Sequence, residues 1–290
     1  MEVYIKLCYN IIVLSHTYLK LKEEIDMRGF KDNKWKLFAV GVFVLLILNT
    51  HLSIKPVAGL YRPALRLVEY QIVSYYIRDY ETIETDNYII RHPGYDEDLL
   101  SFIIDTAEDK YKAATEVFNH NPREKVRMVI YDDLDQMMAA TMLNKGNPPM
   151  GVYYGNTIHI SNPLIWFNEA EYRERYYDEG PILHELVHLL TDRLAKGNFP
   201  IWFTEGVSLY FEYEIDGYKW GEELTDEEID FTIDELTYDF HRLNQYKAYT
   251  KSFRLVKSYV QLQGVEDLIQ LINDLGQGTQ IKEYHYLFTQ

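Results

Sequence analysis

Apolar positions between residues 88 and 160 switch between strand spacing and helical spacing, which predicts a domain that mixes α and β structure. Short β-prone runs are separated by a long apolar stripe at helical spacing. The pattern also predicts that a β-hairpin ends this region, because two β-prone runs are joined by Gly155-Asn156. The predicted elements are a strand at 88–91, a helix at 98–118, a strand at 126–131, a short helix at 133–142 and a hairpin at 151–160.

Helical spacing dominates after residue 180. Pro181 and Pro200 mark two helix starts, and Gly197 supplies a stop signal for the first of them. Further helices are predicted at 226–236, 252–262, 265–275 and 279–288. We therefore expect a domain at 60–290, divided near residues 219–224 into a sheet-containing part, 60–220, and a helical part, 221–290.

The N-terminal region predicts membrane attachment. Residues 37–48 are an uninterrupted apolar run, which continues more weakly to residue 54 and follows Arg28, Lys31, Lys34 and Lys36. A segment of this length just spans a bilayer, so we expect a signal anchor at 37–54 behind a cytoplasmic segment at 1–36. The domain at 60–290 would then lie outside the cytoplasm. Cleavage of the segment, which would give a secreted protein, stays open.

The start of the chain allows two interpretations. Met27-Arg28-Gly29-Phe30-Lys31 resembles the usual beginning of an exported protein, so residues 1–26 are interpreted as an over-extended start. The alternative is a short amphipathic helix in the cytoplasm.

Composition removes one class of function. The formal net charge is −16, and no cluster of lysine and arginine interleaved with aromatic residues occurs, so nucleic-acid binding is not expected. Cys8 is the only cysteine, so one chain forms no internal disulfide. Acidic residues concentrate between Glu222 and Glu235, which favours a solvated surface; recognition of basic substrates is the weaker alternative.

His184-Glu185-Leu186-Val187-His188 is the most informative motif. Histidines four residues apart project from one face of a helix, so both imidazoles can reach one small cation. The helix is otherwise apolar, and buried polar side chains need partners. Glu185 lies close enough to act on a water at the metal without being a ligand.

Glu205 is the expected third ligand. Residues 189–204 leave room for the first helix to end and for a second helix to return beside it. Three protein ligands leave one zinc position open, which is the catalytic arrangement. We therefore expect one Zn²⁺ per chain.

The combined motif resembles a known family. It is similar to the motif of the gluzincin metallopeptidases, in particular the peptidase MA-like domains of bacterial envelope proteins. The matching residues are His184, Glu185 and His188, followed by Trp202-Phe203-Thr204-Glu205-Gly206-Val207-Ser208-Leu209-Tyr210. The resemblance covers the chain from about Tyr88 onward. It implies an α+β zincin (thermolysin-like) fold with a mixed sheet, an active-site helix and a helical C-terminal part. It also implies that His184, His188 and Glu205 bind zinc and that Glu185 is the general base.

A peptidase of this kind needs a hydrogen-bond donor for the negative charge that develops on the substrate carbonyl. Tyr249-Thr250-Lys251-Ser252 resembles the stretch that carries this tyrosine in gluzincin aminopeptidases, although Ser252 replaces their glycine. Tyr249 is therefore the expected donor. Tyr246 and Tyr210 are alternatives, and His241 is the next candidate.

In the same family, the strand before the active-site helix forms the sheet edge that pairs with substrate. The resemblance places the hairpin there, and we expect substrate contacts from Tyr153, Tyr154 and Thr157. His159 is interpreted as a residue on the strand surface rather than a ligand. The motif with which related aminopeptidases hold a free N-terminus is absent, so the mode of cleavage stays open.

The function that the sequence favours is a membrane-anchored, zinc-dependent metallopeptidase that acts on a peptide or protein. Two alternatives remain: a catalytically inactive zincin-fold interaction module at the membrane surface, and a membrane-anchored structural protein in which the motif is accidental.

Overall fold

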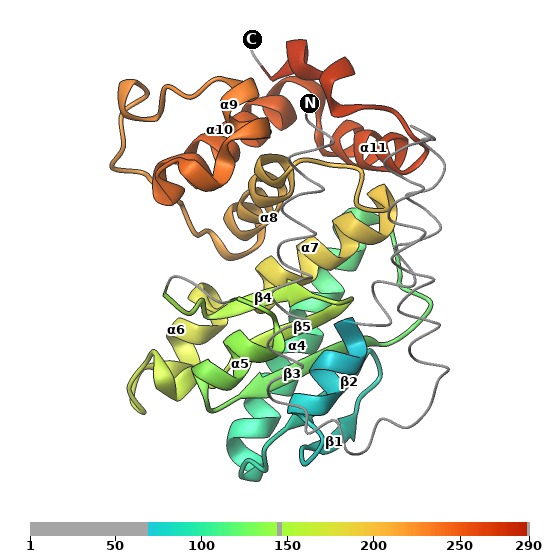
Figure 1. Ribbon diagram of the computed structural model, residues 1–290, viewed down its shortest axis with the longest axis vertical. Helices are drawn as coiled ribbons and strands as arrows, with labels where there is room; N and C mark the ends of the chain where they lie inside the picture. The colour runs from blue at the N-terminus through green and yellow to red at the C-terminus, as the bar shows by residue number, and fades with distance from the viewer. Residues whose placement is uncertain (1–68, 144–146, 289–290) are drawn as a thin grey trace, which may run out of the picture. The chain divides into compact units, whose positions relative to one another are not determined.

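Five strands form one mixed sheet in the order β1-β2-β3-β5-β4 (Figure 1). The computed structural model describes residues 69–143 and 147–288, so the expected cytoplasmic segment and the anchor at 37–54 lie outside the described residues. The strands are β1 (Glu81–Glu84), β2 (Tyr88–His92), β3 (Val126–Tyr131), β4 (Gly151–Tyr154) and β5 (Thr157–Ser161).

The pairing leaves β4 at an edge. β2, β3 and β5 run parallel to one another, whereas β1 and β4 pair antiparallel with β2 and β5. Gly155 and Asn156 both have positive φ, 60° and 59°, which is the backbone that a two-residue hairpin turn requires. The hairpin predicted from Gly155-Asn156 is confirmed.

Helices cover both faces of the sheet. Helices α4 (Glu97–Phe118) and α7 (Ile182–Ala195) lie over one face, and α5 (Leu134–Ala140) lies over the other together with the helical residues 69–76. Strand β3 therefore buries residues on both sides. Met128 and Ile130 face the larger core, while Val129 and Tyr131 face the smaller one.

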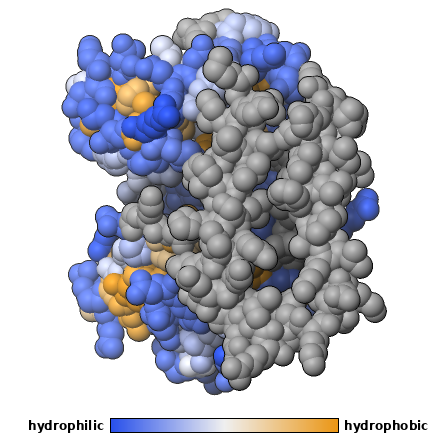
Figure 2. All heavy atoms as spheres, in the orientation of Figure 1, coloured by the Kyte–Doolittle hydropathy of each residue, from blue (hydrophilic) through white to orange (hydrophobic). Residues whose placement is uncertain are grey.

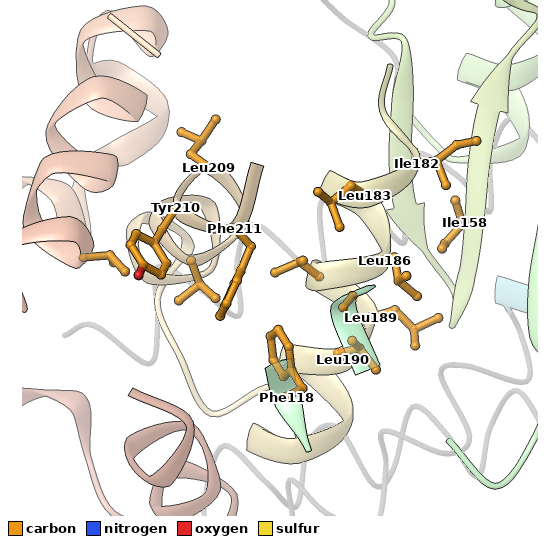
Figure 3. Close-up of a cluster of buried hydrophobic side chains, with 14 of the residues drawn as sticks. Phe118, Ile158, Ile182, Leu183, Leu186, Leu189, Leu190, Leu209, Tyr210 and Phe211 are labelled. Atoms are coloured by element: carbon orange, nitrogen blue, oxygen red, sulfur yellow. The ribbon is translucent and has the colours of Figure 1, made fainter. Parts of the chain in front are cut away.

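Helix α7 is the centre of the larger core. Figure 3 shows Leu183, Leu186 and Leu190 of this helix between the sheet and α8 (Ile201–Asp216). Phe118 at the end of α4 meets Phe211 of α8, with ring centroids 4.9 Å apart. Because apolar contacts surround α7, its polar residues are held in fixed positions.

The helical part packs on the far side of α7 and α8. It consists of α10 (Gln245–Gln263) and α11 (Val265–Gly276), with the shorter α9 (Ile233–Tyr238) beside α8 (Figure 1). Helix α6 (Tyr172–Glu179) precedes α7. Short 3-10 segments complete the described chain: η3 (Pro163–Ile165), η4 (Glu227–Ile229), η5 (Phe240–Arg242), η6 (Ile281–Glu283) and η7 (His285–Leu287).

Gly206 permits an unusually close approach between α8 and α10. A Cβ atom at this position would lie 2.4 Å from the Ser252 carbonyl oxygen and 2.7 Å from Cγ2 of Val256. Only a glycine fits there, because real Cβ contacts are longer. The residue that follows the expected ligand Glu205 therefore sets the distance to the helix that carries Tyr249.

Most predicted elements agree with the structure, and the exceptions lie in the polar parts of the chain. The predicted helix at 226–236 is wrong, because η4 ends at Ile229 and a capping box of Thr232 and Glu235 starts a separate α9. The predicted helix at 279–288 is also wrong, since only η6 and η7 form there. Helix α10 begins earlier than expected because Asn244 caps it. Strand β1 was missed since its side chains are mostly exposed and polar.

The described residues contain no helix that is both long and apolar enough to cross a membrane.

Candidate metal centre and active site

The three predicted ligands converge from two neighbouring helices. His184 and His188 lie one turn apart on α7, and Glu205 lies in the second turn of α8. Oε2 of Glu205 is 3.3 Å from Nε2 of His184 and 3.4 Å from Nε2 of His188. One ligand atom from each residue lies within 4.8 Å of the others. Helix packing alone therefore brings both imidazoles to one carboxylate oxygen.

These distances fit a zinc ion. Ligand atoms that sit about 2.1 Å from a tetrahedral metal are about 3.4 Å from one another, as the geometry of a tetrahedron requires. The two nitrogen–oxygen distances match this spacing, and two imidazole nitrogens with one carboxylate oxygen are a donor set that zinc prefers. The side chains are 12–18% exposed, so the group is largely buried but still reached by solvent.

Both histidines are oriented through their other ring nitrogen. Nδ1 of His184 lies 3.0 Å from Oε2 of Glu212, and Nδ1 of His188 lies 2.7 Å from the Thr204 hydroxyl oxygen. A histidine that donates from Nδ1 presents the lone pair of Nε2 to the metal. The Ser208 hydroxyl also donates to the His184 carbonyl oxygen at 3.1 Å, which fixes α8 against α7. The orientation of the ligands is therefore built into the packing.

Burial and neighbouring charges act in opposite directions at this site. Burial by itself lowers the pKa of His184, but the carboxylates of Glu212 and Glu205 outweigh it and raise that pKa well above its usual value. Burial raises the pKa of Glu205, yet the two histidines together hold it well below its usual value. Glu205 is therefore ionised, as a metal ligand must be.

Glu185 is 6% exposed and lies beside the triad. Its burial raises its pKa, while His184 and His188 partly offset this effect. The backbone N–H of Tyr153 in β4 donates a hydrogen bond to the Glu185 carboxylate. A carboxylate with a raised pKa, close to the ligands but not one of them, has the properties of a general base.

Gly151 allows β4 to approach this carboxylate. A Cβ atom at Gly151 would lie 2.6 Å from Cβ of Pro181 and 3.1 Å from Cγ of Glu185. Any side chain there would push β4 away from the start of α7. Gly151 therefore fixes the distance between the sheet edge and Glu185.

Tyr249 lies on the opposite side of the site, on α10. Its Cα is one helical turn before Ser252, the residue that Gly206 contacts. The pKa of Tyr249 is raised well above its usual value by burial first, and then by the carboxylates of Glu205 and Glu185. The hydroxyl is therefore close enough to feel both site carboxylates. Within the described chain it makes no hydrogen bond to another protein group, which leaves it able to donate elsewhere.

The alternative donors are engaged elsewhere. The Tyr210 hydroxyl bonds to Glu214, and the Tyr246 hydroxyl donates to Oε1 of Glu223 at 2.5 Å. His241 is exposed in η5. Of the three tyrosine candidates, Tyr249 is the one whose pKa is raised by Glu205 and Glu185.

The expected substrate residues of the hairpin divide between the two faces of the sheet. Tyr153 faces α7, and its hydroxyl donates to Oδ2 of Asp192 at 2.8 Å. Tyr154 and Thr157 face the smaller core; the Tyr154 hydroxyl meets Sδ of Met142 at 3.0 Å, and Thr157 is buried. The expectation that all three side chains meet substrate needs correction. Successive residues of a strand point to opposite faces, so Tyr153 and Tyr154 do not share one.

His159 also needs correction, because it is not on the surface of the strand. It is fully buried, with Nδ1 2.9 Å from the Tyr131 hydroxyl and Nε2 3.3 Å from the Tyr154 carbonyl oxygen. Burial lowers its pKa to about 4, so it is a neutral core residue. The sequence pattern did not indicate the burial of His159, because that burial depends on helices covering both faces of β5. His159 lies outside the triad, as expected.

A helix-borne pair of histidines, a carboxylate from the next helix and a buried glutamate beside them define the class of the metallopeptidases. Residues 106–286 match the peptidase MA superfamily, and the chain belongs to this family. It is a metallopeptidase, a hydrolase. None of the curated proteins compared with the chain matches it.

Sequence reasoning missed Glu212 and Thr204, which orient the two histidines. A signal for Glu212 was present, because it lies two helical turns after Glu205 and so on the same face of α8. Thr204 had no signal beyond its position next to Glu205. Both roles depend on how α8 is rotated against α7.

Glu212→Gln should lower metal affinity by about 10- to 100-fold, because a neutral amide holds the Nδ1–H of His184 less strongly. The affinity is measured by competition with a zinc chelator. Glu214→Gln is the matched control, since Glu214 is exposed on the same helix and should change the affinity little. Equal metal affinities for the two variants would contradict the orienting role.

Proposed function

We propose that this protein has a zincin, thermolysin-like fold and hydrolyses peptide bonds with one zinc ion per chain. The observation that carries the proposal is the convergence of two Nε2 atoms on Oε2 of Glu205 at tetrahedral spacing, 3.3 Å and 3.4 Å. Both histidines are already oriented by Glu212 and Thr204. The site is therefore assembled for a metal rather than being a chance meeting of polar residues.

Zinc in this triad would act as a Lewis acid that polarises the scissile carbonyl and acidifies a water ligand. Glu185 is the general base: it takes a proton from the attacking water and delivers it to the leaving amine. Its raised pKa supports this double role, because a base that is too acidic accepts a proton poorly. The Tyr153 N–H and the Gly151 contact keep its carboxylate in place.

Tyr249 is the donor to the substrate oxygen that becomes negatively charged. A hydroxyl held in place before reaction stabilises that charge without having to reorganise. The raised pKa keeps the proton on Tyr249 at neutral pH. Figure 2 shows the surface hollowed between the helical part with α9 and α10 and the part with α6 and the sheet, where a peptide could enter.

The open edge of β4 supplies backbone contacts for the peptide. The Ser161 N–H donates to the Met150 carbonyl oxygen at 2.9 Å, and bonded pairs alternate along an antiparallel ladder. Val152 and Tyr154 therefore bond β5, and the backbone groups of Gly151 and Tyr153 face away from it. The Tyr153 N–H is used by Glu185, so a peptide in extended conformation can pair with the remaining groups as an added strand.

We also propose that residues 37–54 anchor the protein in the cell membrane, with the catalytic domain outside the cytoplasm. The support is the apolar run at 37–48 and the basic residues before it. The domain would act on peptides or proteins near the membrane surface.

Glu185→Gln should keep stoichiometric metal and lose about 10²- to 10⁴-fold in kcat, because the change removes the base and no ligand. Metal content is measured by mass spectrometry and hydrolysis by cleavage of a peptide library. Hydrolysis at the parent rate would refute the base assignment. A metal-loaded parent that cleaves no peptide would instead favour the inactive interaction module.

Tyr249→Phe should lower kcat by about 10²- to 10³-fold with little change in KM, since it removes one donor used in the transition state. Tyr210→Phe is the control, because that hydroxyl bonds to Glu214 and should not affect kcat. Steady-state kinetics on one cleaved peptide compares the two. Similar kcat values in both variants would remove Tyr249 from the mechanism.

The full chain should sediment with membranes and resist extraction at alkaline pH. Replacing Leu45 and Leu46 by arginine should release it, because two charges in the apolar run make insertion unfavourable by about 5–7 kcal/mol in total. Protease added to intact cells should digest the domain of the parent protein. Equal extraction of parent and variant would exclude the anchor.

A further inference from the structure

Three tyrosines gather around Trp220, on the α10 side of the site. The Trp220 ring centroid lies 5.2 Å from that of Tyr246, 6.0 Å from that of Tyr249 and 6.3 Å from that of Tyr218. Two of these residues come from the segment after α8 and two from the first turns of α10. We call Tyr218, Trp220, Tyr246 and Tyr249 the aromatic wall.

Hydrogen bonds and close packing hold the aromatic wall in place. The Trp220 indole N–H donates to the Tyr246 carbonyl oxygen at 3.4 Å. Arg254 donates to the Gly221 carbonyl oxygen at 3.0 Å, and Gly221 packs so tightly on Thr250 that a Cβ would lie 2.1 Å from its hydroxyl oxygen. The segment after α8 is thus fixed on α10, and the rings form a prearranged surface.

The aromatic wall runs alongside the metal centre. At one end, Tyr249 is one turn from Ser252, which abuts Gly206 next to the ligand Glu205. At the other end, Tyr218 lies two residues after the end of α8. Its pKa is raised mainly by burial, and the next largest cause is the carboxylate of Glu212, which orients His184. A peptide whose carbonyl reaches the triad therefore has a neighbouring side chain close to these rings.

The outer part of the aromatic wall is exposed and edged by a carboxylate. Tyr218 is 41% exposed and Tyr246 is 40% exposed, and the Tyr246 hydroxyl donates to Glu223. This hydrogen bond lowers the pKa of Glu223, which is ionised at neutral pH.

Within the described residues Glu223 forms no salt bridge. Two nearby cations form their ion pairs with other carboxylates: Lys219 pairs with Glu222 at 3.2 Å, and Arg254 pairs with Asp226 at 2.6 Å. Arg254 also contributes to the lowered pKa of Glu223, but forms no salt bridge with it. Among residues 69–143 and 147–288, no lysine or arginine pairs with Glu223. An ionised carboxylate beside exposed rings is left to face a ligand.

We propose that the aromatic wall and Glu223 bind the lysine or arginine side chain of a substrate residue next to the bond that is cleaved. This inference rests on the peptidase function proposed above. The faces of tyrosine and tryptophan rings attract cations, and the aliphatic stem of lysine or arginine packs against rings while its charged end reaches a carboxylate. A neutral apolar side chain gains nothing from Glu223, and an acidic side chain is repelled by it.

Matched peptides test the proposal. A peptide that the zinc-loaded protein cleaves is varied at each position beside the cleaved bond, with lysine, norleucine or glutamate. At one position, kcat/KM should be about tenfold higher for lysine than for norleucine, and lower still for glutamate. Glu223→Gln should reduce the lysine-to-norleucine ratio to about 1–2 and leave norleucine cleavage unchanged, because it removes only the charge.

The control is Glu222→Gln, which removes the neighbouring carboxylate that pairs with Lys219 and should keep the tenfold ratio. Trp220→Ala should lower kcat/KM for the lysine and norleucine peptides alike, since it removes the packing surface. Equal cleavage of lysine and norleucine peptides at every position by the parent would overturn the inference while leaving the peptidase function intact.

Absence of any cleavage would overturn the proposed function instead, and a binding measurement then decides the inference. The same peptides are titrated against metal-loaded Glu185→Gln, with intrinsic tryptophan fluorescence as the readout. Tighter binding of the lysine peptide, lost in the additional Glu223→Gln change, supports the inference. Equal dissociation constants for lysine and norleucine peptides overturn it.

Discussion

The structure depends on the distance and rotation between α7 and α8. Two imidazoles from one helix and a carboxylate from the next share a cation only if their ligand atoms lie about 3.4 Å apart. Leucines of α7 pack against both the sheet and α8, and the Ser208 hydroxyl bonds the His184 carbonyl, so neither helix can slide. Gly206 then lets α10 come close behind Glu205. A core without these contacts would separate the ligands.

The same packing removes four carboxyl groups wholly or partly from solvent. Glu185, Glu205, Glu212 and Asp216 are all buried or half-buried within one region. Lys110 of α4 is paired with Asp216, both side chains are 4% exposed, and its ammonium lies 3.9 Å from the Tyr177 ring centroid. Burial still raises the pKa of Asp216 to about 6. Buried carboxylates are costly without cations, so a bound metal would stabilise the fold as well as supply chemistry.

The parts that would meet substrate come from opposite sides of this centre. The edge strand β4 approaches Glu185 through Gly151, and α10 brings Tyr249 to the other side. Both approaches require a glycine at the point of contact, because a single Cβ would displace the strand or the helix. The catalytic distances are thus set by backbone packing rather than by flexible side chains.

The sequence alone determined the elements with strong periodicity and the residues of the triad. The stripe at 98–118 became α4, the run at 126–131 became β3, and His184 and His188 carry the fixed spacing of one helical turn; Glu205 was recognised from the residues around it, and packing brings it to them. Local rules sufficed there, since side chains four residues apart on a helix share a face wherever the helix lies. Tertiary structure decided what depends on rotation and layering. In the folded protein Tyr154 and Thr157 face away from α7, and His159 is buried between two helical layers. The packing of α8 on α7 also places Glu212 where it orients His184. No spacing in the chain encodes these outcomes, because they follow from which faces are covered and how two helices rotate against each other.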